Sequence, residues 1–243
     1  MDLSAVGLTV RFGALAALNR VDLEVASGER RAVIGPNGAG KTTLLNVIAG
    51  EHRPTEGSVR LGGRDATPLP PWQRARLGLG RTFQRSTLFS QLTVAENIAL
   101  AVRARTRDGW RFWPGREDEL NEEVSRRLEA GGIAHLACRP AGRLGHGERR
   151  IVEVELALAA SPSALLLDEP MAGLSGDERQ KTLERLRSLP KEVTVVIVEH
   201  DIDAVFALAE RITVLDHGVK IAEGTPAEVR ANARVQEVYL GGL

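Results

Sequence analysis

The sequence predicts an α/β fold with a mostly parallel core sheet, an N-terminal antiparallel β part and an inserted helical lobe. Short apolar runs alternate with helical stretches toward both ends of the chain, as in a parallel sheet covered by helices. In the middle, apolar side chains recur about every four residues and no strand pattern occurs. The length of 243 residues and the hydrophobic content of 43% allow a full core.

The N-terminal part is predicted to begin with strands. Four short runs are either alternating or continuously apolar, namely residues 8–10, 21–25, 31–34 and 59–61. A glycine-rich stretch, Gly35 to Gly40, follows the third run. From Thr43 the apolar residues continue without a breaker to Gly50, which predicts a buried helix with a glycine stop. Strand, loop and helix are therefore expected in that order.

The helical lobe is predicted from about residue 92 to residue 159. Val94, Ile98 and Val102 are about four positions apart, which is the spacing of one helix face. Residues 108–116 interrupt the pattern with two glycines and a proline, so we expect a loop that covers the lobe. A loop that faces a partner is the alternative.

Beyond the lobe the strand pattern returns. Residues 164–167 and 193–198 are apolar on both faces, as expected for buried parallel strands. Residues 176–189 between them have a helical pattern. Another helix is expected from Thr225, with Pro226 near its start, and we interpret it as a cap on the domain rather than a dimer contact.

Charge and cysteine content exclude several classes of function. The formal net charge is zero, so no overall field attracts nucleic acid, and no nucleic-acid partner is expected. The single cysteine, Cys138, cannot form an internal disulfide, which fits a reducing cytosol. The first ten residues lack the pattern of a secretory signal, and no apolar run approaches the roughly 20 residues of a bilayer span. A membrane pore would have to come from another chain.

The glycine-rich stretch carries the strongest motif. It reads Gly35-Pro36-Asn37-Gly38-Ala39-Gly40-Lys41-Thr42 and matches G-x-x-x-x-G-K-[ST], the P-loop, between a predicted strand and helix. Its glycines let amide groups approach a polyphosphate, Lys41 reaches the β- and γ-phosphates, and the Thr42 hydroxyl binds Mg²⁺. Together with Thr43, these residues are the predicted ATP site. The predicted fold is therefore that of a P-loop NTPase.

A second motif places two carboxylates at a strand end. The apolar run 165–167 leads directly into Asp168 and Glu169, and nucleotide sites of open α/β sheets lie at such strand ends. Asp168 is expected to hold Mg²⁺, and Glu169 to orient and polarise the attacking water. Alone, the pair could be a solvated strand end. Following a P-loop, it favours the nucleotide site.

The combination resembles the ATP-binding cassette (ABC) family over essentially the whole chain. The resemblance implies one nucleotide-binding domain over residues 1–243. Its ATP-binding core with a β subdomain would comprise about 1–91 and 160–243, and its helical signature subdomain about 92–159. ATP and Mg²⁺ are the implied cofactors.

The family's remaining site elements follow in order along the sequence. The resemblance implies that Phe12 stacks on adenine, that Gln84 contacts Mg²⁺ and acts in catalysis, and that His200 bonds the γ-phosphate. The signature sequence is Leu144-Gly145-His146-Gly147-Glu148, whose last four residues would contact ATP bound to a second subunit. The D-loop is Ala172-Gly173-Leu174-Ser175.

The signature and the D-loop depart from the family pattern. Gly145 replaces the signature serine, His146 a glycine and Glu148 a glutamine, while Ser175 replaces the D-loop aspartate. The lost serine hydroxyl leaves only backbone amides, including those of a helix expected to begin near Glu148, to bind the partner's phosphate. We expect slower turnover or weaker dimerisation than in a fully matching cassette.

Other stretches resemble the importers of branched-chain and other hydrophobic amino acids. They are residues 81–84, 92–97, 198–201 and 235–241. The implied partners are transmembrane permease subunits, a second ABC ATPase subunit that is either a copy or a paralogue, and indirectly a solute-binding protein. The implied location is the cytoplasmic face of the cell membrane. Residues 85–91 are the candidate contact with the permease.

Four alternatives remain open on sequence alone. A urea or amide importer and a lipopolysaccharide-export system use related ATPase subunits. A soluble ABC ATPase without a transport role would usually carry two cassettes or a long coiled coil, and neither pattern occurs here. A regulator that binds adenylates without hydrolysis is disfavoured by the intact Glu169.

Overall fold

Two compact units divide the chain. The computed structural model describes residues 1–82, 86–105 and 117–240. The first unit, called the sheet unit, comprises residues 1–79, 163–169 and 189–243, and the second, the helical unit, comprises 80–162 and 170–188. The expected lobe of 92–159 lies within the helical unit. The predicted loop at 108–116 lies outside the described residues.

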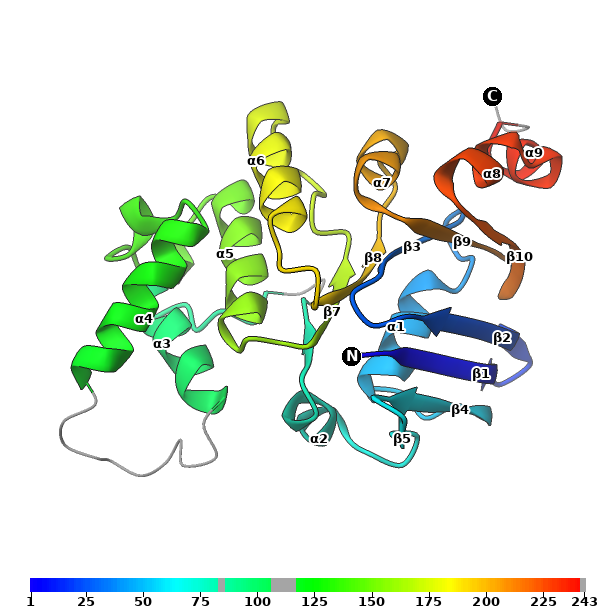
Figure 1. Ribbon diagram of the computed structural model, residues 1–243, viewed down its shortest axis with the longest axis horizontal. Helices are drawn as coiled ribbons and strands as arrows, with labels where there is room; N and C mark the ends of the chain where they lie inside the picture. The colour runs from blue at the N-terminus through cyan, green and yellow to red at the C-terminus, as the bar shows by residue number, and fades with distance from the viewer. Residues whose placement is uncertain (83–85, 106–116, 241–243) are drawn as a thin grey trace. The chain divides into compact units, whose positions relative to one another are not determined.

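A four-stranded antiparallel sheet forms one layer of the sheet unit. Its strand order is β2-β1-β4-β5, and β1 pairs antiparallel with both β2 and β4. The bounds are β1 Leu3–Phe12, β2 Leu15–Val25, β4 Glu56–Leu61 and β5 Arg64–Asp65. Figure 1 shows these strands beside α1. The antiparallel N-terminal part follows the prediction, with longer strands than the apolar runs indicated.

The second sheet is the mostly parallel one. Its strand order is β10-β9-β3-β8-β7-β6, with β3 parallel to β8 and β9, and β7 parallel to β8. Only β10 is antiparallel to its neighbour β9 among the pairings described. The bounds are β3 Arg30–Ile34, β6 Leu79–Arg81, β7 Ala164–Asp168, β8 Thr194–Val198, β9 Arg211–Asp216 and β10 Val219–Gly224. The predicted α/β fold class is confirmed.

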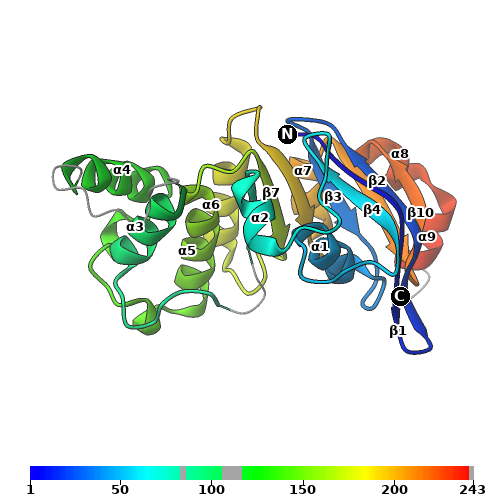
Figure 2. The same ribbon diagram turned by 90° about the horizontal axis from the view of Figure 1, so that it is seen from below.

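One hydrophobic core joins both sheets to α1 (Lys41–Ala49). Leu44 and Ile48 of this helix are fully buried among side chains of β1, β2, β3 and β8. Figure 2 shows α1 between the strands of the two sheets. The helix that follows the P-loop therefore packs against both sheets, and this packing fixes the position of its N-terminus.

The C-terminal segment forms two helices instead of the single expected one. They are α8 (Pro226–Ala231) and α9 (Ala233–Leu240), and both pack against β10. The break falls at Asn232, whose side-chain oxygen accepts the amide hydrogens of Arg234 at 3.0 Å and Val235 at 3.2 Å. Asn232 thus starts a new helix rather than continuing the old one.

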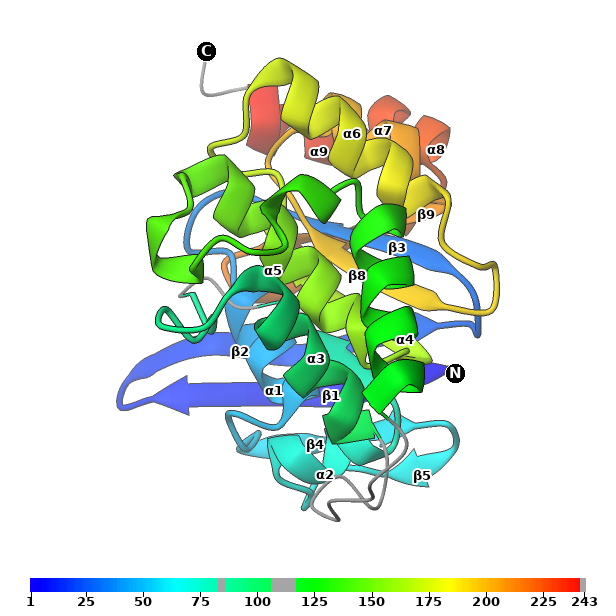
Figure 3. The ribbon, with the colours of Figure 1, turned by 90° about the vertical axis from the view of Figure 1, so that its left-hand side faces the viewer.

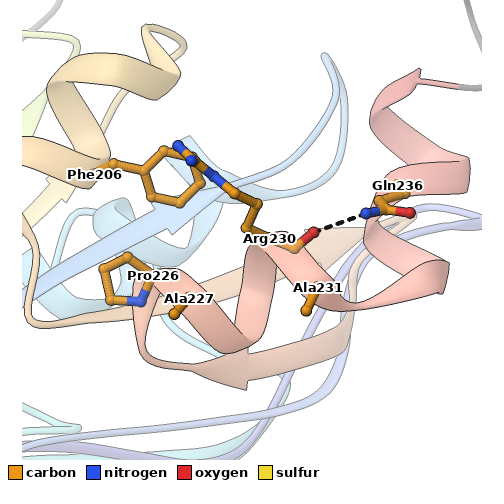
Figure 4. Close-up of a pocket in the computed structure, with 6 residues that line it drawn as sticks. All are labelled: Phe206, Pro226, Ala227, Arg230, Ala231 and Gln236. Carbon is orange, nitrogen blue, oxygen red and sulfur yellow. Dashed lines mark hydrogen bonds between the residues drawn. The ribbon is translucent and has the colours of Figure 1, made fainter.

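A hollow of about 550 Å³ lies among α7 (Ile202–Leu208), α8 and α9. Figure 4 shows Arg230 lying over the ring of Phe206, at 4.4 Å from guanidinium carbon to ring centroid. Gln236 donates to the Arg230 carbonyl oxygen at 2.9 Å. None of the predicted nucleotide-site residues lines this hollow.

The helical unit has a core of its own. Its helices are α3 (Val94–Arg105), α4 (Glu117–Ala130), α5 (His146–Ala159) and α6 (Gly176–Arg187), with two 3-10 turns, η1 (Ala134–Leu136) and η2 (Ala141–Arg143). Val94 and Ile98 of α3 pack with Val124 and Leu128 of α4 and with Val152 of α5. Figure 3 shows α3, α4 and α5 together. In the described ranges, no helix combines the length and the apolar character of a bilayer span.

Candidate nucleotide-binding site

The P-loop joins β3 to α1, as the motif predicts. A Cβ on Gly35 would stand 2.2 Å from the Leu215 carbonyl oxygen, and one on Gly40 would stand 2.6 Å from that of Ala17. Side chains are therefore excluded at both ends of the loop. At Gly38, where φ is 81°, the Cβ position meets nothing within 4 Å. The loop is anchored at its ends and open in its middle, where a polyphosphate could approach the backbone.

Lys41 is the first residue of α1 and is only 6% exposed. Its ammonium donates hydrogen bonds to the carbonyl oxygens of Gly35 at 2.8 Å and Pro36 at 2.9 Å. Burial lowers the pKa of Lys41, and the nearby Glu169 and Asp168 carboxylates oppose that shift. The cation is thus held inside its own loop, close enough to both carboxylates to sense their charge.

The first predicted carboxylate, Asp168, ends β7, all five of whose residues are buried, and the second, Glu169, follows it directly. Asp168 is fully buried, whereas the Glu169 side chain is 28% exposed. The Glu169 amide donates to the Val198 carbonyl at 2.9 Å, and Glu169 adopts a left-handed φ of 51°. That backbone conformation is unfavourable for a residue with a Cβ, and such strain is often found at functional sites.

His200 follows β8 and meets Glu169 across the strand ends. Its Nε2 lies 2.7 Å from Glu169 Oε1. The His200 amide donates to the side chain of Glu199 at 3.0 Å, and Asp201 caps α7 by accepting the Ala204 amide hydrogen at 3.1 Å. The short connection between strand and helix therefore fixes the position of the ring. The structure thus brings together Glu169, predicted to orient the attacking water, and His200, predicted to bond the γ-phosphate.

Phe12 ends β1 and is 49% exposed. Its ring meets that of His52 edge to face, with 5.7 Å between centroids and 77° between planes. His52 belongs to the turn after α1, where its amide donates to the Asn46 carbonyl at 3.3 Å. An exposed aromatic supported on one side leaves surface for a flat ligand such as a purine ring.

The predicted magnesium ligands near the P-loop offer oxygen atoms. Thr42 lies on the first turn of α1 and Asp168 at the end of β7, so they offer a hydroxyl and a carboxylate. Among the described residues, no group of three or more histidine, cysteine or acidic side chains could hold a metal ion by itself. Mg²⁺ prefers one or two protein oxygens together with phosphate oxygens and water, so this donor set fits it. Gln84, the third predicted ligand, lies outside the described residues.

The predicted signature lies at the N-terminus of α5 in the helical unit. This helix begins at His146, two residues before the start expected from the sequence, with Gly145 as its N-cap. The earlier start has a physical cause: the Glu148 carboxylate accepts the Gly145 amide hydrogen at 2.9 Å, which satisfies an N-terminal amide. Arg139 pairs with Glu148 at 2.5 Å.

The signature packs against the D-loop within the helical unit. A Cβ on Gly173 would stand 2.8 Å from the His146 ring, and one on Gly147 would stand 2.4 Å from a Glu178 carboxylate oxygen. Ser175 is the N-cap of α6, and its hydroxyl donates to Glu178 at 2.7 Å. Serine and aspartate are both good N-caps, so Ser175 keeps the helix-starting role of the replaced aspartate.

Two residues of these arrangements were not anticipated. His52 supports Phe12, and Arg139 pairs with Glu148. Neither belongs to a local motif, because each contact joins segments that are separated along the chain. Only the folded arrangement identifies them.

Comparisons with known proteins identify the family of this chain. The family model described as ABC transporter matches residues 18–172, and the one described as branched-chain amino acid ATP-binding cassette transporter matches residues 219–242. The high-affinity branched-chain amino acid transport ATP-binding protein BraF of Pseudomonas aeruginosa is 38% identical, over 98% of this chain and 97% of its own length. The high-affinity branched-chain amino acid transport ATP-binding protein LivG of Escherichia coli is 36% identical, over 98% of this chain and 97% of its own length.

Solved structures extend the comparison to the fold. An ATP-binding cassette of an ABC transporter in its ADP conformation has a TM-score of 0.86 and 31% identity, covering 99% of both chains. A dimeric cassette bound to ADP and phosphate after hydrolysis has a TM-score of 0.81 and 27% identity, covering 92% of this chain and 98% of the other. This chain thus belongs to the ABC transporter family, as an ATP-binding cassette that hydrolyses ATP.

Proposed function

We propose that this chain hydrolyses ATP to energise a permease that imports branched-chain or other hydrophobic amino acids. The observation that carries the substrate class is the match of residues 219–242 to the branched-chain transporter family. That stretch forms β10, α8 and α9, which hold none of the predicted ATP contacts. It therefore adds information beyond general ATPase chemistry and favours this class over urea import and lipopolysaccharide export.

Glu169 and His200 perform the central step of the proposed mechanism. The Glu169 carboxylate accepts a hydrogen bond from a water molecule and so orients that water for attack on the γ-phosphorus. His200, whose Nε2 lies 2.7 Å from Glu169 Oε1, holds that carboxylate in place and would form a hydrogen bond with the γ-phosphate of bound ATP. Phosphoryl transfer needs mainly positioning and charge stabilisation. Glu169 and His200 follow the adjacent parallel strands β7 and β8, so the sheet itself positions them beside each other.

The P-loop binds and neutralises the polyphosphate. Its amides surround the phosphates, and Lys41 exchanges its contacts with Gly35 and Pro36 for phosphate oxygens. Thr42 and Asp168 would hold Mg²⁺, which supplies positive charge to the β- and γ-phosphates. Gln84 is proposed as a further ligand that responds to the permease.

The remaining roles involve adenine and a second subunit. Phe12 stacks on the adenine ring, and His52 supports it from the side. The backbone of the signature residues Gly145 to Glu148 contacts ATP held by a second ABC subunit, either a copy of this chain or a paralogue. The chain works at the cytoplasmic face of the membrane, attached through the permease.

Hydrolysis is tested with two variants. Glu169→Gln is expected to bind ATP normally, to release phosphate at least about a hundredfold more slowly and to accumulate a dimer, because the base is lost while the P-loop stays intact. Lys41→Ala is expected to lose most ATP affinity. Retained phosphate release in the first variant, or retained micromolar affinity in the second, contradicts the assigned role.

The substrate class is tested separately. The chain is tagged in its native host, the membranes are solubilised gently, and the complex that co-purifies is reconstituted in liposomes with its solute-binding protein. Radiolabelled leucine, urea and a polar amino acid are then compared for ATP-dependent uptake. Uptake of leucine supports the proposal. Uptake of urea alone, or recovery of lipopolysaccharide-export components, removes the substrate class and leaves the ATPase chemistry in place.

A further inference from the structure

The N-terminal end of α5 already holds an anion from its own chain. The Glu148 carboxylate reaches back and accepts the Gly145 amide hydrogen at 2.9 Å. Amides at a helix N-terminus attract negative charge, whether it comes from a side chain or from a phosphate. The same helix end is the one proposed to contact the γ-phosphate bound to a second subunit.

Arg139 restrains this carboxylate. Its Nη1 lies 2.5 Å from Glu148 Oε1, and its Nη2 donates to the Arg143 carbonyl at 3.2 Å. The hydrogen bond from Gly145, followed by the one from Arg139, lowers the pKa of Glu148, so the group is ionised at neutral pH. Glu148 is thus charged and tethered on two sides.

The same capping arrangement recurs on three other helices. Glu96 accepts the Thr93 amide hydrogen at 2.7 Å on α3, Glu178 accepts the Ser175 amide hydrogen at 2.9 Å on α6, and Glu228 accepts the Thr225 amide hydrogen at 2.7 Å on α8. The residue before each of these helices also has a hydroxyl, which Gly145 lacks. Within the described ranges, Glu96, Glu178 and Glu228 form no ion pair comparable to that of Glu148 with Arg139. Among these four helices, the carboxylate is held by an arginine only at the signature.

We propose that Glu148, held by Arg139, is a built-in competitor that occupies the signature helix end until the γ-phosphate of a partner-bound ATP displaces it. The inference rests on the proposed function, since it needs the signature to act on a second subunit. Two anions at one helix end repel each other, so the carboxylate must move when the phosphate arrives. The Glu148 charge therefore raises the ATP concentration at which two subunits close, and Arg139 offsets part of that charge.

The charge is tested without removing the cap. Glutamine also serves at this position of a capping box, so Glu148→Gln keeps the helix start and removes the charge. The variant is made together with Glu169→Gln, which suppresses hydrolysis, and the ATP concentration for half-maximal dimerisation is measured by size-exclusion chromatography with light scattering. We expect a decrease of roughly two- to fivefold, the size of a helix-end charge interaction.

Two further variants make the test specific. Glu228→Gln removes the equivalent charge from α8 and is expected to leave the half-maximal ATP concentration unchanged. Arg139→Gln leaves Glu148 charged and uncompensated, and is expected to raise it. If Glu148→Gln matches Glu228→Gln, or raises the value, the competitor role is wrong while ATP-driven dimerisation still supports the proposed function. If no variant dimerises with ATP, the proposal fails together with the dimeric mechanism.

Discussion

Glu169 shows how a single residue combines strain and function. Its left-handed φ of 51° costs a residue with a Cβ about 1–2 kcal/mol. The surrounding structure maintains this conformation through two contacts. The Glu169 amide donates a hydrogen bond to the Val198 carbonyl oxygen at 2.9 Å, and the Glu169 carboxylate lies 2.7 Å from His200 Nε2. The conformation places a carboxylate beside the histidine, so stability is given up at the site of the proposed chemistry.

This strain predicts an inverted ranking of two variants. Glycine normally destabilises a protein relative to alanine, but it adopts a left-handed φ without steric cost. Glu169→Gly is therefore expected to be more stable than Glu169→Ala by about 1 kcal/mol, although both lose the carboxylate. Urea unfolding of the nucleotide-free variants measures the difference. Equal stabilities, or the usual ranking, would show that the backbone at residue 169 is not strained.

At the scale of single residues, the sequence predicted the site residues that belong to contiguous motifs. The P-loop and the pair Asp168 and Glu169 are contiguous stretches whose chemistry follows from residue type and order. The partners of Phe12 and Glu148 could not be predicted, because they depend on which distant segments fold together. His52 is 40 positions from Phe12 (52 minus 12), and no periodicity joins them.

Among the elements, α1 is held at its C-terminal end by a buried arginine. Arg74 of α2 (Pro71–Arg76) is 1% exposed and donates to the carbonyl oxygens of Val47 at 2.6 Å and Ile48 at 2.7 Å, and also to that of Leu69 at 3.0 Å. These include final carbonyls of the helix whose other end is the P-loop. A cation at a helix C-terminus also favours the helix dipole.

Replacing this arginine should destabilise the sheet unit. Arg74→Met fills similar space but leaves several buried carbonyls without a donor, so we expect a loss of about 2–4 kcal/mol in the free energy of unfolding. Arg76→Met is the matched control on the same helix, because Arg76 is exposed and only lies over Trp72 at 5.0 Å. Urea unfolding compares the two. Similar small losses in both variants would contradict the capping role.

A charged cluster ties β10 to the buried Arg31 of β3. Glu223 lies 2.9 Å from the Arg31 guanidinium and 2.8 Å from the Lys220 ammonium. Burial by itself raises the pKa of Glu223, but the contacts with Lys220 and Arg31 outweigh it and lower the pKa below its ordinary 4.5. A lowered pKa in the folded state stabilises the protein above pH 4.5, and that stability is lost as the pH falls through the folded value.

The sign of this linkage predicts a pH-dependent variant. At pH 7, Glu223→Gln is expected to lower the free energy of unfolding by about 1–2 kcal/mol. The difference from the wild type should shrink as the pH falls below 4.5 and through the folded value, because Glu223 then becomes protonated in the folded state as well. Exposed Glu192→Gln is the control. A loss that stays constant from pH 7 to pH 3 would show that the charge of Glu223 is not what stabilises β10.

Most buried elements and those marked by glycine were predicted, whereas several elements near the C-terminus were missed. The sequence analysis did not identify β9, β10 or α7, although all three belong to the sheet unit. The seven residues of α7 span only two helical turns, too few for a clear periodicity. The burial of β10 alternates weakly, as expected at the edge of a sheet, so pairing with β9 rather than sequence determines it.

At the scale of the whole chain, the path between the two units links the functional segments. The helical unit contributes α5, the chain then enters the sheet unit for residues 163–169, and it leaves again through the D-loop into α6. Glu169 is thus the last residue of a short crossing that has the signature helix on one side and the D-loop on the other. Along the chain, Glu169 is therefore joined directly to the helical unit at Pro170, and through residues 163–168 at Pro162.

The missing signature serine can be restored to test how two subunits cooperate. Gly145 has φ −62° and ψ 168°, which any residue adopts, and its Cβ position meets only a Glu148 oxygen at 3.6 Å, an ordinary contact. Serine caps a helix only a few tenths of a kcal/mol better than glycine, so the stability of the isolated chain should barely change with Gly145→Ser.

The effect should therefore appear only when two subunits close over ATP. A hydroxyl bonded to a charged phosphate contributes about 1.5–3 kcal/mol, so we expect the ATPase rate to rise, or the ATP concentration needed for dimerisation to fall, by roughly tenfold. Gly145→Ala adds the same Cβ without the hydroxyl and should bring no gain. If serine and alanine both leave the two measurements at the wild-type level, the signature of this chain does not bind a partner's phosphate through that position, and its departure from the family pattern carries no functional cost.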